Sequence, residues 1–525
     1  MKRCLSLGLA ALLLLTPCAG LGEKMRDYYG AYLAAVESGD AAFEARIRAE
    51  MPARLYPARD QETGLMGYIN YLGEWAIAPQ FAFASLFRGN YACVRVSYDN
   101  DYSDGIIDRE GSWVVEPCYI IDEGYDGWTY GGLNRGISFV YRPLTEEEKA
   151  LPREEQPRQY GYFDVPSGYF SGIRLSSEPN RCWGSSPLMP MYDGEAPCYV
   201  NRATGEAALR LPENLCLDDL WQDSDFHQGW AMAWDEETDQ TFFISEQGEL
   251  VEFAPDMECR SEDSACGLVR VKRTVTQESG FMKSTQSLYG YYDLNKRDWL
   301  IPPCLEEAYP FSASGYAFLR TGTDEQGRPV YGFMDRTGAV IASGFQGPGE
   351  FLQEYAYLKT DGLLIDAQGN TVVRVPEGAE LTAIWDDELC DERDAWVSPE
   401  GLMELYVPYE TENGRKKTRV CVMNLRGEWV ISPDAPFGSY SGEGSYEWHR
   451  FFSCGLEPVS LKTQDENAVP QVGYVNSQGE VVIDFLYSDG AVFLDGLALV
   501  EKDGQRGYID PFGHEIYFWK YLIHD

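Results

Sequence analysis

The stretch GYVNSQGEVVIDF at residues 473–485 decides the fold, because GYIDPFGHEI at 507–516 repeats its pattern soon afterwards. Internal repetition of this kind is the signature of repeat architectures, in which one structural unit is copied along the chain. The clearer relatives are GYINYLGEWAIAP (67–79), GIIDREGSWVVEP (105–117), GFMDRTGAVIA (332–342), LLIDAQGNTVV (363–373) and CVMNLRGEWVISP (421–433). Weaker copies start at residues 161, 198, 242 and 290, which makes eleven copies in all.

Each copy predicts a β-hairpin whose turn starts with Asp or Asn and has Gly three residues later. The Asp or Asn side chain accepts hydrogen bonds from the following backbone N–H groups, and Gly adopts the left-handed conformation that other residues resist. A type I turn followed by such a Gly is a common hairpin connection. The predicted turn residues are Asn70, Gly73, Asp108, Gly111, Asp335, Gly338, Asp366, Gly369, Asn424, Gly427, Asn476, Gly479, Asp510 and Gly513. The turns at 164–168 and 201–205 carry one extra residue, and Lys296 stands where the 290 copy should have Gly.

A second element follows many of the hairpins. It has a Phe, a polar turn and a strand in which Ala alternates with large apolar residues, as in FRGNYACVRV (87–96), FSASGYAFL (311–319) and FLDGLALV (493–500). Such alternation suits a strand with one face packed tightly against a neighbouring unit. We therefore predict an all-β fold of tandem antiparallel hairpins that form a propeller-like ring or an open toroid, with a β-solenoid as the alternative.

The hairpin pattern and the element after it resemble the WG-repeat (KWG) proteins of bacteria. The resemblance covers roughly residues 64–518, with seven clear copies and four degenerate ones. It implies little about function, because such arrays are generally regarded as binding or scaffold modules.

The N-terminal residues predict an export signal followed by a cap. Lys2 and Arg3 precede an apolar run that is too short to span a bilayer, which is typical of a signal peptide over residues 1–20. The alternative is a lipoprotein signal with an acylated Cys18. Residues 21–60 have helical spacing and predict a helical cap on the repeat array at 61–525, whose insertions lie near 120–160 and 380–415. No later segment is apolar enough to predict a transmembrane helix.

The charge of the chain limits its partners. The sequence has 84 acidic and 43 basic residues and a formal net charge of −41, which disfavours nucleic acid and anionic membranes. Of its 13 cysteines, two fall in the predicted signal and the remaining eleven are scattered without a CxxC pair, which argues against structural zinc. Cys259 and Cys266 are the nearest candidates for a disulfide.

No catalytic motif emerges from the residues. The four histidines do not pair at metal-ligand spacing, and there is no GxSxG, HExxH or phosphate-loop pattern, so neither an enzyme nor a cofactor is predicted. Residues 99–110 partly match a calcium loop, but Asp104 replaces the required Gly and strand patterns flank the segment, so an acidic connecting loop is the simpler interpretation.

Aromatic loops give the better indication of a binding site. Trp128 and Tyr130 lie in DGWTYGG, and Tyr446 and Trp448 lie in SYEWHRFF. Exposed Tyr and Trp stack on sugars and anchor protein interfaces. The expected function is a non-catalytic exported scaffold that binds a protein or glycan partner in the cell envelope or outside the cell. Two alternatives stay open: an aromatic cell-wall-binding array, and a hydrolase with its site in an insertion.

Overall fold

The computed structural model describes residues 54–520 with internal gaps, and nearly all of its regular structure is antiparallel β-strand. The gaps are residues 98–103, 122–132, 134–135, 153–154, 158, 176–185, 193–196, 218–223, 236, 239, 255, 261–262, 280–281, 385–394, 411–413, 441–451, 464–467 and 495. The predicted signal peptide and the helical stretches of the predicted cap lie outside the described residues. Strand β1 (Tyr56–Arg59) shows that sheet structure starts before the predicted boundary at residue 61.

Eleven structural units follow one another along the described chain, and the strands of each pair in sequence order except in unit 6, where the first two strands both pair with the third. Units 1 to 4 contain β1, β2 (Met66–Ile69) and β3 (Trp75–Phe81); β4 (Phe83–Ala84), β5 (Tyr91–Arg95), β6 (Asp104–Asp108) and β7 (Trp113–Ile121); β8 (Ile137–Tyr141), β9 (Tyr160–Asp164) and β10 (Tyr169–Phe170); and β11 (Leu188–Tyr192), β12 (Pro197–Asn201) and β13 (Ala207–Arg210). The end of β7 also pairs with β8, so β7 is both the last strand of unit 2 and the first strand of unit 3.

Units 5 to 8 continue the same order. Their strands are β14 (Leu215–Cys216), β15 (Trp230–Asp235), β16 (Gln240–Ser245) and β17 (Leu250–Glu252); β18 (Met257–Glu258), β19 (Ser264–Ala265), β20 (Leu268–Ser279), β21 (Met282–Asp293) and β22 (Asp298–Leu305); β23 (Tyr316–Thr323), β24 (Pro329–Asp335) and β25 (Val340–Phe345); and β26 (Glu350–Leu352), β27 (Tyr355–Leu358), β28 (Leu363–Asp366) and β29 (Thr371–Arg374).

Units 9 to 11 complete the array. Their strands are β30 (Glu380–Thr382), β31 (Leu402–Glu410), β32 (Lys416–Asn424) and β33 (Trp429–Ile431); β34 (Phe437–Ser439), β35 (Leu456–Leu461), β36 (Val472–Asn476) and β37 (Val481–Tyr487); and β38 (Asp489–Gly490), β39 (Ala498–Lys502), β40 (Gln505–Ile509) and β41 (Glu515–Lys520). The last hairpin of every unit is one of the eleven sequence copies. Outside the strands, the short helix α4 (Glu146–Lys149) lies in the predicted insertion near 120–160 and the 3₁₀ turn η4 (Ser453–Gly455) precedes β35.

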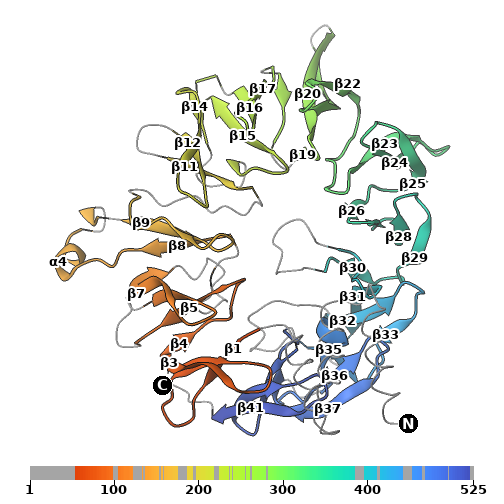
Figure 1. Ribbon diagram of the computed structural model, residues 1–525. Coiled ribbons are helices and arrows are strands. Elements are labelled where there is room, and N and C mark those ends of the chain that lie inside the picture. The colour runs from red at the N-terminus through yellow and green to blue at the C-terminus, as the bar shows by residue number, and fades with distance from the viewer. Residues whose placement is uncertain are drawn as a thin grey trace, which may run out of the picture.

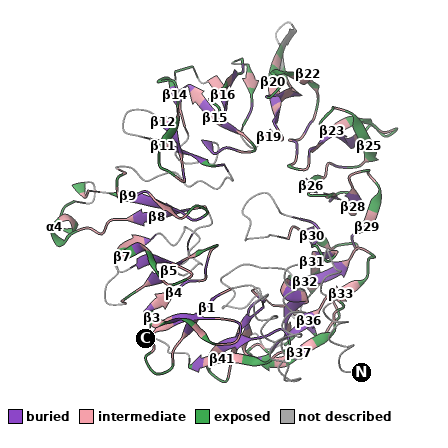
Figure 2. Ribbon diagram, viewed as in Figure 1, coloured by how far each residue is buried: buried purple, intermediate pink, exposed green. Residues whose placement is uncertain are grey.

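The units are arranged around a ring (Figure 1), which places β26 and β30 on its inner side and β29 and β33 on its outer side. The core is divided in the same way. Among the described residues there are eleven apolar clusters, and each joins side chains of two successive units. Buried residues follow the inner and middle strands, and exposed ones gather on outer strands such as β25 (Figure 2). The core of this fold is thus a circle of interfaces between neighbouring sheets.

The eleventh cluster packs the last unit against the first. It combines Leu497, Tyr508 and Trp519 of unit 11 with Tyr56 and Ile69 of unit 1. The Tyr508 hydroxyl donates a hydrogen bond to the carbonyl of Pro57 at 2.9 Å, in the next unit around the ring.

This hydrogen bond belongs to a repeated type. In the same way, the Tyr68 hydroxyl reaches the carbonyl of Ser85, and the Tyr474 hydroxyl reaches that of Ala491, both at 2.8 Å. The closing contact therefore uses the same interaction as the internal ones. Of the alternatives left by the sequence, the ring describes the structure, because a linear solenoid would leave the first and last units apart.

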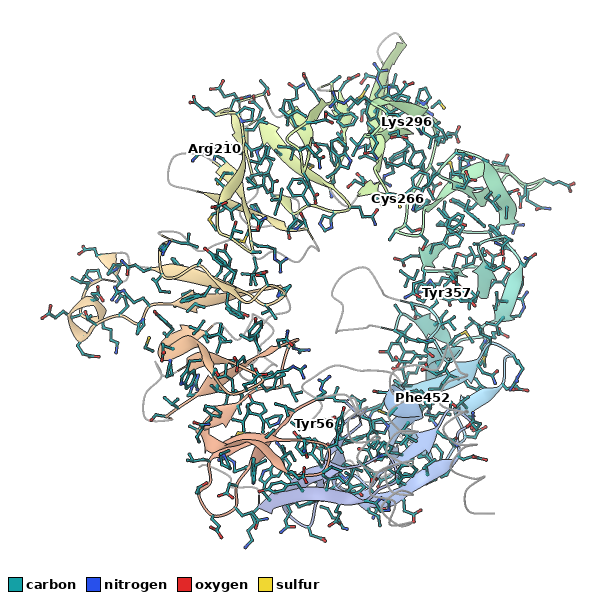
Figure 3. All side chains as sticks on the ribbon, viewed as in Figure 1. Tyr56, Arg210, Cys266, Lys296, Tyr357 and Phe452 are labelled. Carbon is teal, nitrogen blue, oxygen red and sulfur yellow. The ribbon has the colours of Figure 1, made fainter. Side chains whose placement is uncertain are left out.

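The connections of every sheet leave at two opposite ends of its strands, which we call edges. Because the strands are antiparallel, the first-to-second connection and the third-to-fourth turn leave at one edge, which we call the turn edge. The second-to-third hairpin leaves at the other edge, which we call the hairpin edge. Figure 1 shows α4 and the end of the β20–β21 hairpin, both on hairpin edges, at the periphery of the ring. Cys266, in the first-to-second connection of unit 6, lies on the inner side of the ring (Figure 3).

Candidate functional site

The repeated Asp/Asn-x-x-Gly turn serves the ring itself. In the β36–β37 hairpin, the N–H of Gly479 donates to the carbonyl of Asn476 at 2.9 Å. Asn476 Oδ1 accepts from the N–H groups of Gln478 and Glu480 at 3.0 and 2.9 Å. Gly479 has φ +78°, in the left-handed region. All seven Asp/Asn-Gly pairs named from the sequence have this N–H to carbonyl hydrogen bond and a left-handed Gly.

The degenerate copies keep the turn by other means. Ser245 replaces Asp in unit 5, and its hydroxyl oxygen accepts from the N–H of Glu249 at 3.1 Å. The five-residue turns starting at Asp164 and Asn201 close on Gly168 and Gly205. The 290 copy is also a five-residue turn. Its left-handed residue is Arg297, with φ 56°, so the prediction that Lys296 takes the place of Gly was wrong by one residue.

The turn Gly also contacts the preceding unit. A Cβ on Gly479 would lie 2.2 Å from the carbonyl oxygen of Val430 in unit 9, and one on Gly513 would lie 3.3 Å from Ile483 in unit 10. A Cβ on Gly73 of unit 1 would lie 2.9 Å from the carbonyl oxygen of Ile516 in unit 11. The repeated residues are thus used for building and closing the ring, and a site for a partner has to be sought among residues that depart from the repeat.

The aromatic candidates Trp128, Tyr130, Tyr446 and Trp448 lie outside the described residues, as do Asp99 and Asp101 of the tested calcium loop. Residues 104–108 of that loop belong to β6, where Asp104 pairs with Arg95 at 2.6 Å. Within the described ranges, no group of three or more His, Cys, Asp or Glu side chains is arranged to hold a metal ion. Cys259 and Cys266 do not form a disulfide in this structure. No helix in the described part of the chain is long and apolar enough to span a bilayer.

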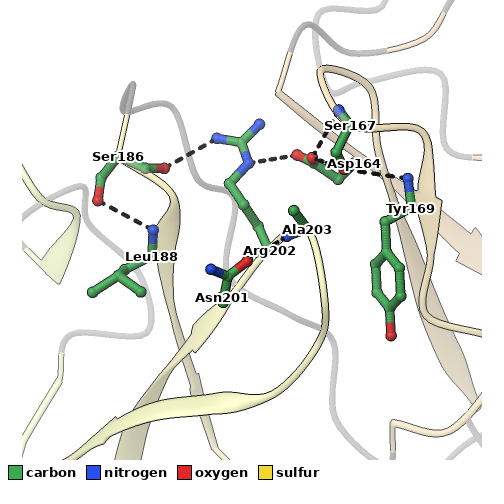
Figure 4. Close-up of polar contacts among 8 residues, drawn as sticks. All are labelled: Asp164, Ser167, Tyr169, Ser186, Leu188, Asn201, Arg202 and Ala203. Carbon is green, nitrogen blue, oxygen red and sulfur yellow. Dashed lines mark hydrogen bonds and ion pairs between the residues drawn. The ribbon is translucent and has the colours of Figure 1, made fainter.

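One departure from the repeat is a series of polar side-chain contacts that links the turns of units 3, 4 and 5. Arg202, in the unit 4 turn, makes a buried ion pair with Asp164 of the unit 3 turn, with 2.5 Å between Nε and Oδ1 (Figure 4). The Arg202 guanidinium also reaches the carbonyl of Ser186, whose hydroxyl donates to Glu246 of the unit 5 turn at 2.8 Å. A buried charge is tolerable only when it is paired, so this series of contacts fixes the turn edges of three units relative to one another.

The second departure is Glu457, a fully buried carboxylate in β35. It lies opposite Val475, the residue just before the turn Asn476. In five other units the equivalent position is a buried Ala: Ala92, Ala231, Ala317, Ala356 and Ala498. The core therefore does not need a carboxylate here. The sequence analysis did not identify Glu457. An alignment of the second strands of the units would have shown it as an acidic residue at a position that is Ala in five other units.

Glu457 is held by groups at both ends of the first-to-second connection of unit 10. The Ser439 hydroxyl donates to Oε1 at 2.6 Å, and the N–H of Phe452 donates to Oε2 at 3.1 Å. Phe452 has a left-handed backbone with φ 54°, which is uncommon for a residue with a side chain. Burial raises the pKa of Glu457 to about 7, although these two hydrogen bonds lower it.

A second carboxylate, Glu404 of β31, acts on Glu457 from unit 9. The neighbouring Leu402, on the same face of β31, packs in the cluster between units 9 and 10, and the repulsion from Glu404 contributes to the raised pKa of Glu457. Burial raises the pKa of Glu404 itself to about 7. Two acids with raised pKa values thus face one apolar interface, an arrangement that is frequent at functional sites.

Both departures lie in the parts of the ring with the longest first-to-second connections. Unit 8 joins β26 to β27 through residues 353–354 alone, whereas the corresponding connections are 122–136 in unit 3, 217–229 in unit 5, 383–401 in unit 9 and 440–455 in unit 10. All of these leave at the turn edge. The candidate functional site is therefore the turn edge of two sectors of the ring, units 3–5 and units 9–10.

The described architecture is that of a propeller-like repeat protein. The sequence model of the WG containing repeat matches residues 66–98, 289–322 and 473–505, so the chain contains WG repeats, as the resemblance predicted. Each match starts in the third strand of one unit and ends in or just after the second strand of the next unit.

Solved structures with similar folds show only a weak likeness. One is a eukaryotic initiation factor, with 10% identity, a TM-score of 0.33 and coverage of 90% of this chain and 96% of that chain. Another is the β-propeller domain of the Trilobed protease from Pyrococcus furiosus, with 11% identity, a TM-score of 0.22 and coverage of 49% and 80%. A third is prolyl oligopeptidase B from Galerina marginata, with 10% identity, a TM-score of 0.23 and coverage of 66% and 55%. At these TM-scores the likeness supports no functional assignment. No curated protein sequence matches the chain.

Proposed function

We propose that the protein is a non-catalytic, exported repeat scaffold that binds a protein or glycan partner at the turn edge of units 3–5 and 9–10. The observation that carries this proposal is the division of labour among the residues. The repeated Asp/Asn residues build the turns, the repeated Gly and Tyr residues make contacts between units, and the departures from the repeat gather beside the longest connections. Binding residues are commonly found on loops that a rigid scaffold positions.

The charge of the chain favours a partner with a cationic surface. A net charge of −41 attracts positively charged molecules over long range and repels anionic ones. Such attraction weakens as salt screens it over about 8 Å at physiological ionic strength. Association with the partner should therefore weaken with added salt.

Excising one connection tests where the partner binds. Ile384 and Ala395 already pair across the base of residues 385–394, so that segment can be exchanged for an Asn-Gly turn without moving either strand. The matched control exchanges residues 411–415, which join β31 to β32 at the hairpin edge of the same unit, for the same turn.

Both variants and the parent protein are used as bait on a solubilised cell-envelope fraction. We expect a partner that the parent and the hairpin-edge variant retain and the turn-edge variant loses. Equal retention by all three, with both variants folded, would contradict the proposed site. Cell fractionation with N-terminal sequencing tests export: the mature protein should start near residue 20–22, or at an acylated Cys18 for the lipoprotein alternative.

One observation favours a hydrolase as a second candidate, because Glu404 and Glu457 have pKa values near 7, which suits general acid catalysis. Against it, Glu457 is fully buried and both of its oxygens accept hydrogen bonds from the protein. A broad hydrolase screen decides between the two. Turnover that is present in the parent and abolished by Glu457→Gln would favour the enzyme over the scaffold.

A further inference from the structure

We propose that the interface between units 9 and 10 is a proton-sensitive seam of the ring, which Glu404 and Glu457 weaken when both are ionised. The proposal concerns the ring itself and does not depend on the identity of a partner. It assigns a role to two carboxylates that neither the repeat nor the closure of the ring requires.

The position of Glu457 is the first step. The residue opposite the one before the turn is buried in every unit. Besides the five Ala residues already named, it is Tyr56, Ser138, Met189, Val269 or Met403 in the other units. Only unit 10 has an ionisable carboxylate there, so a substitution that removes the charge restores what the repeat carries elsewhere.

Glu404 occupies the next position along the second strand, opposite Val422. This position faces the following unit, and Arg270 is its counterpart in unit 6, opposite Tyr291. Arg270 pairs with Asp263 at 2.5 Å. The ring thus accommodates a charge at this position when a counter-charge accompanies it. At the interface between units 9 and 10 the two charged groups have the same sign.

Groups from each element that packs against Glu457 surround its carboxylate. On β31 the facing titratable group is Glu404. The Ser439 hydroxyl at the end of β34 and the N–H of Phe452 before η4 are neutral hydrogen-bond donors to Glu457. On β36 the titratable neighbour is Tyr474, whose own pKa burial raises well above its usual value and whose hydroxyl donates to Ala491. Tyr487, Asp489 and Tyr440 also act on Tyr474. Within the part of the chain that the structure describes, all the charges in this set are negative or neutral, so ionisation of both glutamates adds repulsion that none of these groups compensates.

The direction of the pH effect follows from linkage. Both carboxyls have folded-state pKa values of about 7, above the usual value of 4.5. The folded ring therefore binds more protons than the unfolded chain between these two values, and its stability falls as pH rises through that window. The stability that protonation confers is fully present below the usual value and is lost above about 7.

A double-mutant cycle at two pH values tests the seam. Glu404→Gln, Glu457→Gln and the double variant are compared with the parent by equilibrium unfolding at about pH 5 and about pH 8.5, on either side of the raised pKa values. At the higher pH we expect each single substitution to stabilise the ring and the double variant to gain less than the sum. At the lower pH we expect this coupling to vanish, because the carboxyls are protonated there.

A coupling that is equal at both pH values, or a pH dependence that survives Glu457→Gln unchanged, would overturn the proposal. Glu457→Ala serves as the second variant if the glutamines fail to fold, because Ala is what five other units tolerate at this position. Hydrogen exchange of the parent adds an independent measurement. After correction for intrinsic rates, amides of β31 and β35 should lose protection between the two pH values while those of β27 and β39 do not. Equal behaviour of both strand pairs would also refute the seam.

Discussion

Replacing Gly479 by Ala tests whether the turn glycine serves the turn alone or also the interface between units. Gly479 has φ +78°, and a Cβ there would lie 2.2 Å from the carbonyl oxygen of Val430 in the preceding unit. The matched control is Gly504→Ala in the β39–β40 hairpin. Gly504 has φ +72° and nothing within 4 Å of the added Cβ. The two substitutions share the backbone strain and differ in the contact.

The magnitudes separate the two effects. Placing Ala in the left-handed region costs about 1–2 kcal/mol, and the lower entropy of the unfolded chain offsets about 0.4–1 kcal/mol of this. The contact with Val430 involves backbone, which cannot rotate away as a flexible side chain could, and overpacking of this kind costs about 1–3 kcal/mol. We therefore expect Gly479→Ala to lose about 1–3 kcal/mol more than Gly504→Ala.

Urea unfolding followed by tryptophan fluorescence measures this difference, provided that the denaturant slopes of the variants agree. Equal losses for Gly479→Ala and Gly504→Ala would refute the interface role of the turn glycine. The same comparison applies to the closure of the ring. Gly73→Ala would place its Cβ 2.9 Å from the carbonyl oxygen of Ile516, so it should resemble Gly479→Ala, whereas in an open chain it would resemble Gly504→Ala.

Three further outcomes are expected. Tyr508→Phe and Tyr474→Phe should each lose about 1 kcal/mol or slightly more in urea unfolding, because each leaves a carbonyl without its hydrogen bond; a silent Tyr508→Phe would argue against closure. Arg202→Met should lose about 3–5 kcal/mol because it leaves Asp164 charged and buried, and adding Asp164→Asn should recover part of that loss. In alkylation followed by mass spectrometry, the exposed Cys118 and Cys304 should react readily and Cys259 slowly, because burial raises the pKa of the Cys259 thiol to about 12; rapid labelling of Cys259 in the folded protein would contradict this.

The sequence predicted the repeated parts of the fold well because they obey local rules. The Asp/Asn and Gly of each turn are sufficient to specify a hairpin, and the small–large alternation in strands such as β5 predicts that one face packs tightly against a neighbouring unit. Ring closure could not be predicted in this way, because it depends on the rotation between successive units, which accumulates over the whole array. The partner of Tyr508 is Pro57, far away in sequence, and nothing local to either residue indicates the other.

The candidate site was harder to predict for a different reason. The carboxylates are numerous, and sequence reasoning cannot tell a solvated Glu from a buried one without knowing which strand face it occupies. Glu457 becomes conspicuous only when the register places it opposite Val475 and equates it with Ala92 and Ala498. The turn of the 290 copy shows the same limit on a smaller scale. Its one extra residue moves the left-handed position from Lys296 to Arg297.

The offset between the sequence repeat and the structural unit explains how the ring closes. A matched repeat, such as 473–505, contains the last two strands of one unit and the first two of the next, so each copy encodes one interface rather than one sheet. The final copy, at 507–516, forms the last hairpin of unit 11, β40–β41. At the other end of the array, β1 precedes the first copy and is the second strand of unit 1. Tyr508 donates its hydrogen bond to β1 as Tyr474 does to the segment after β38. Strand β1 thus packs beside the final copy as the second strand of the following unit packs beside the other copies, and the ring closes through an interface of the same kind as those between its other units.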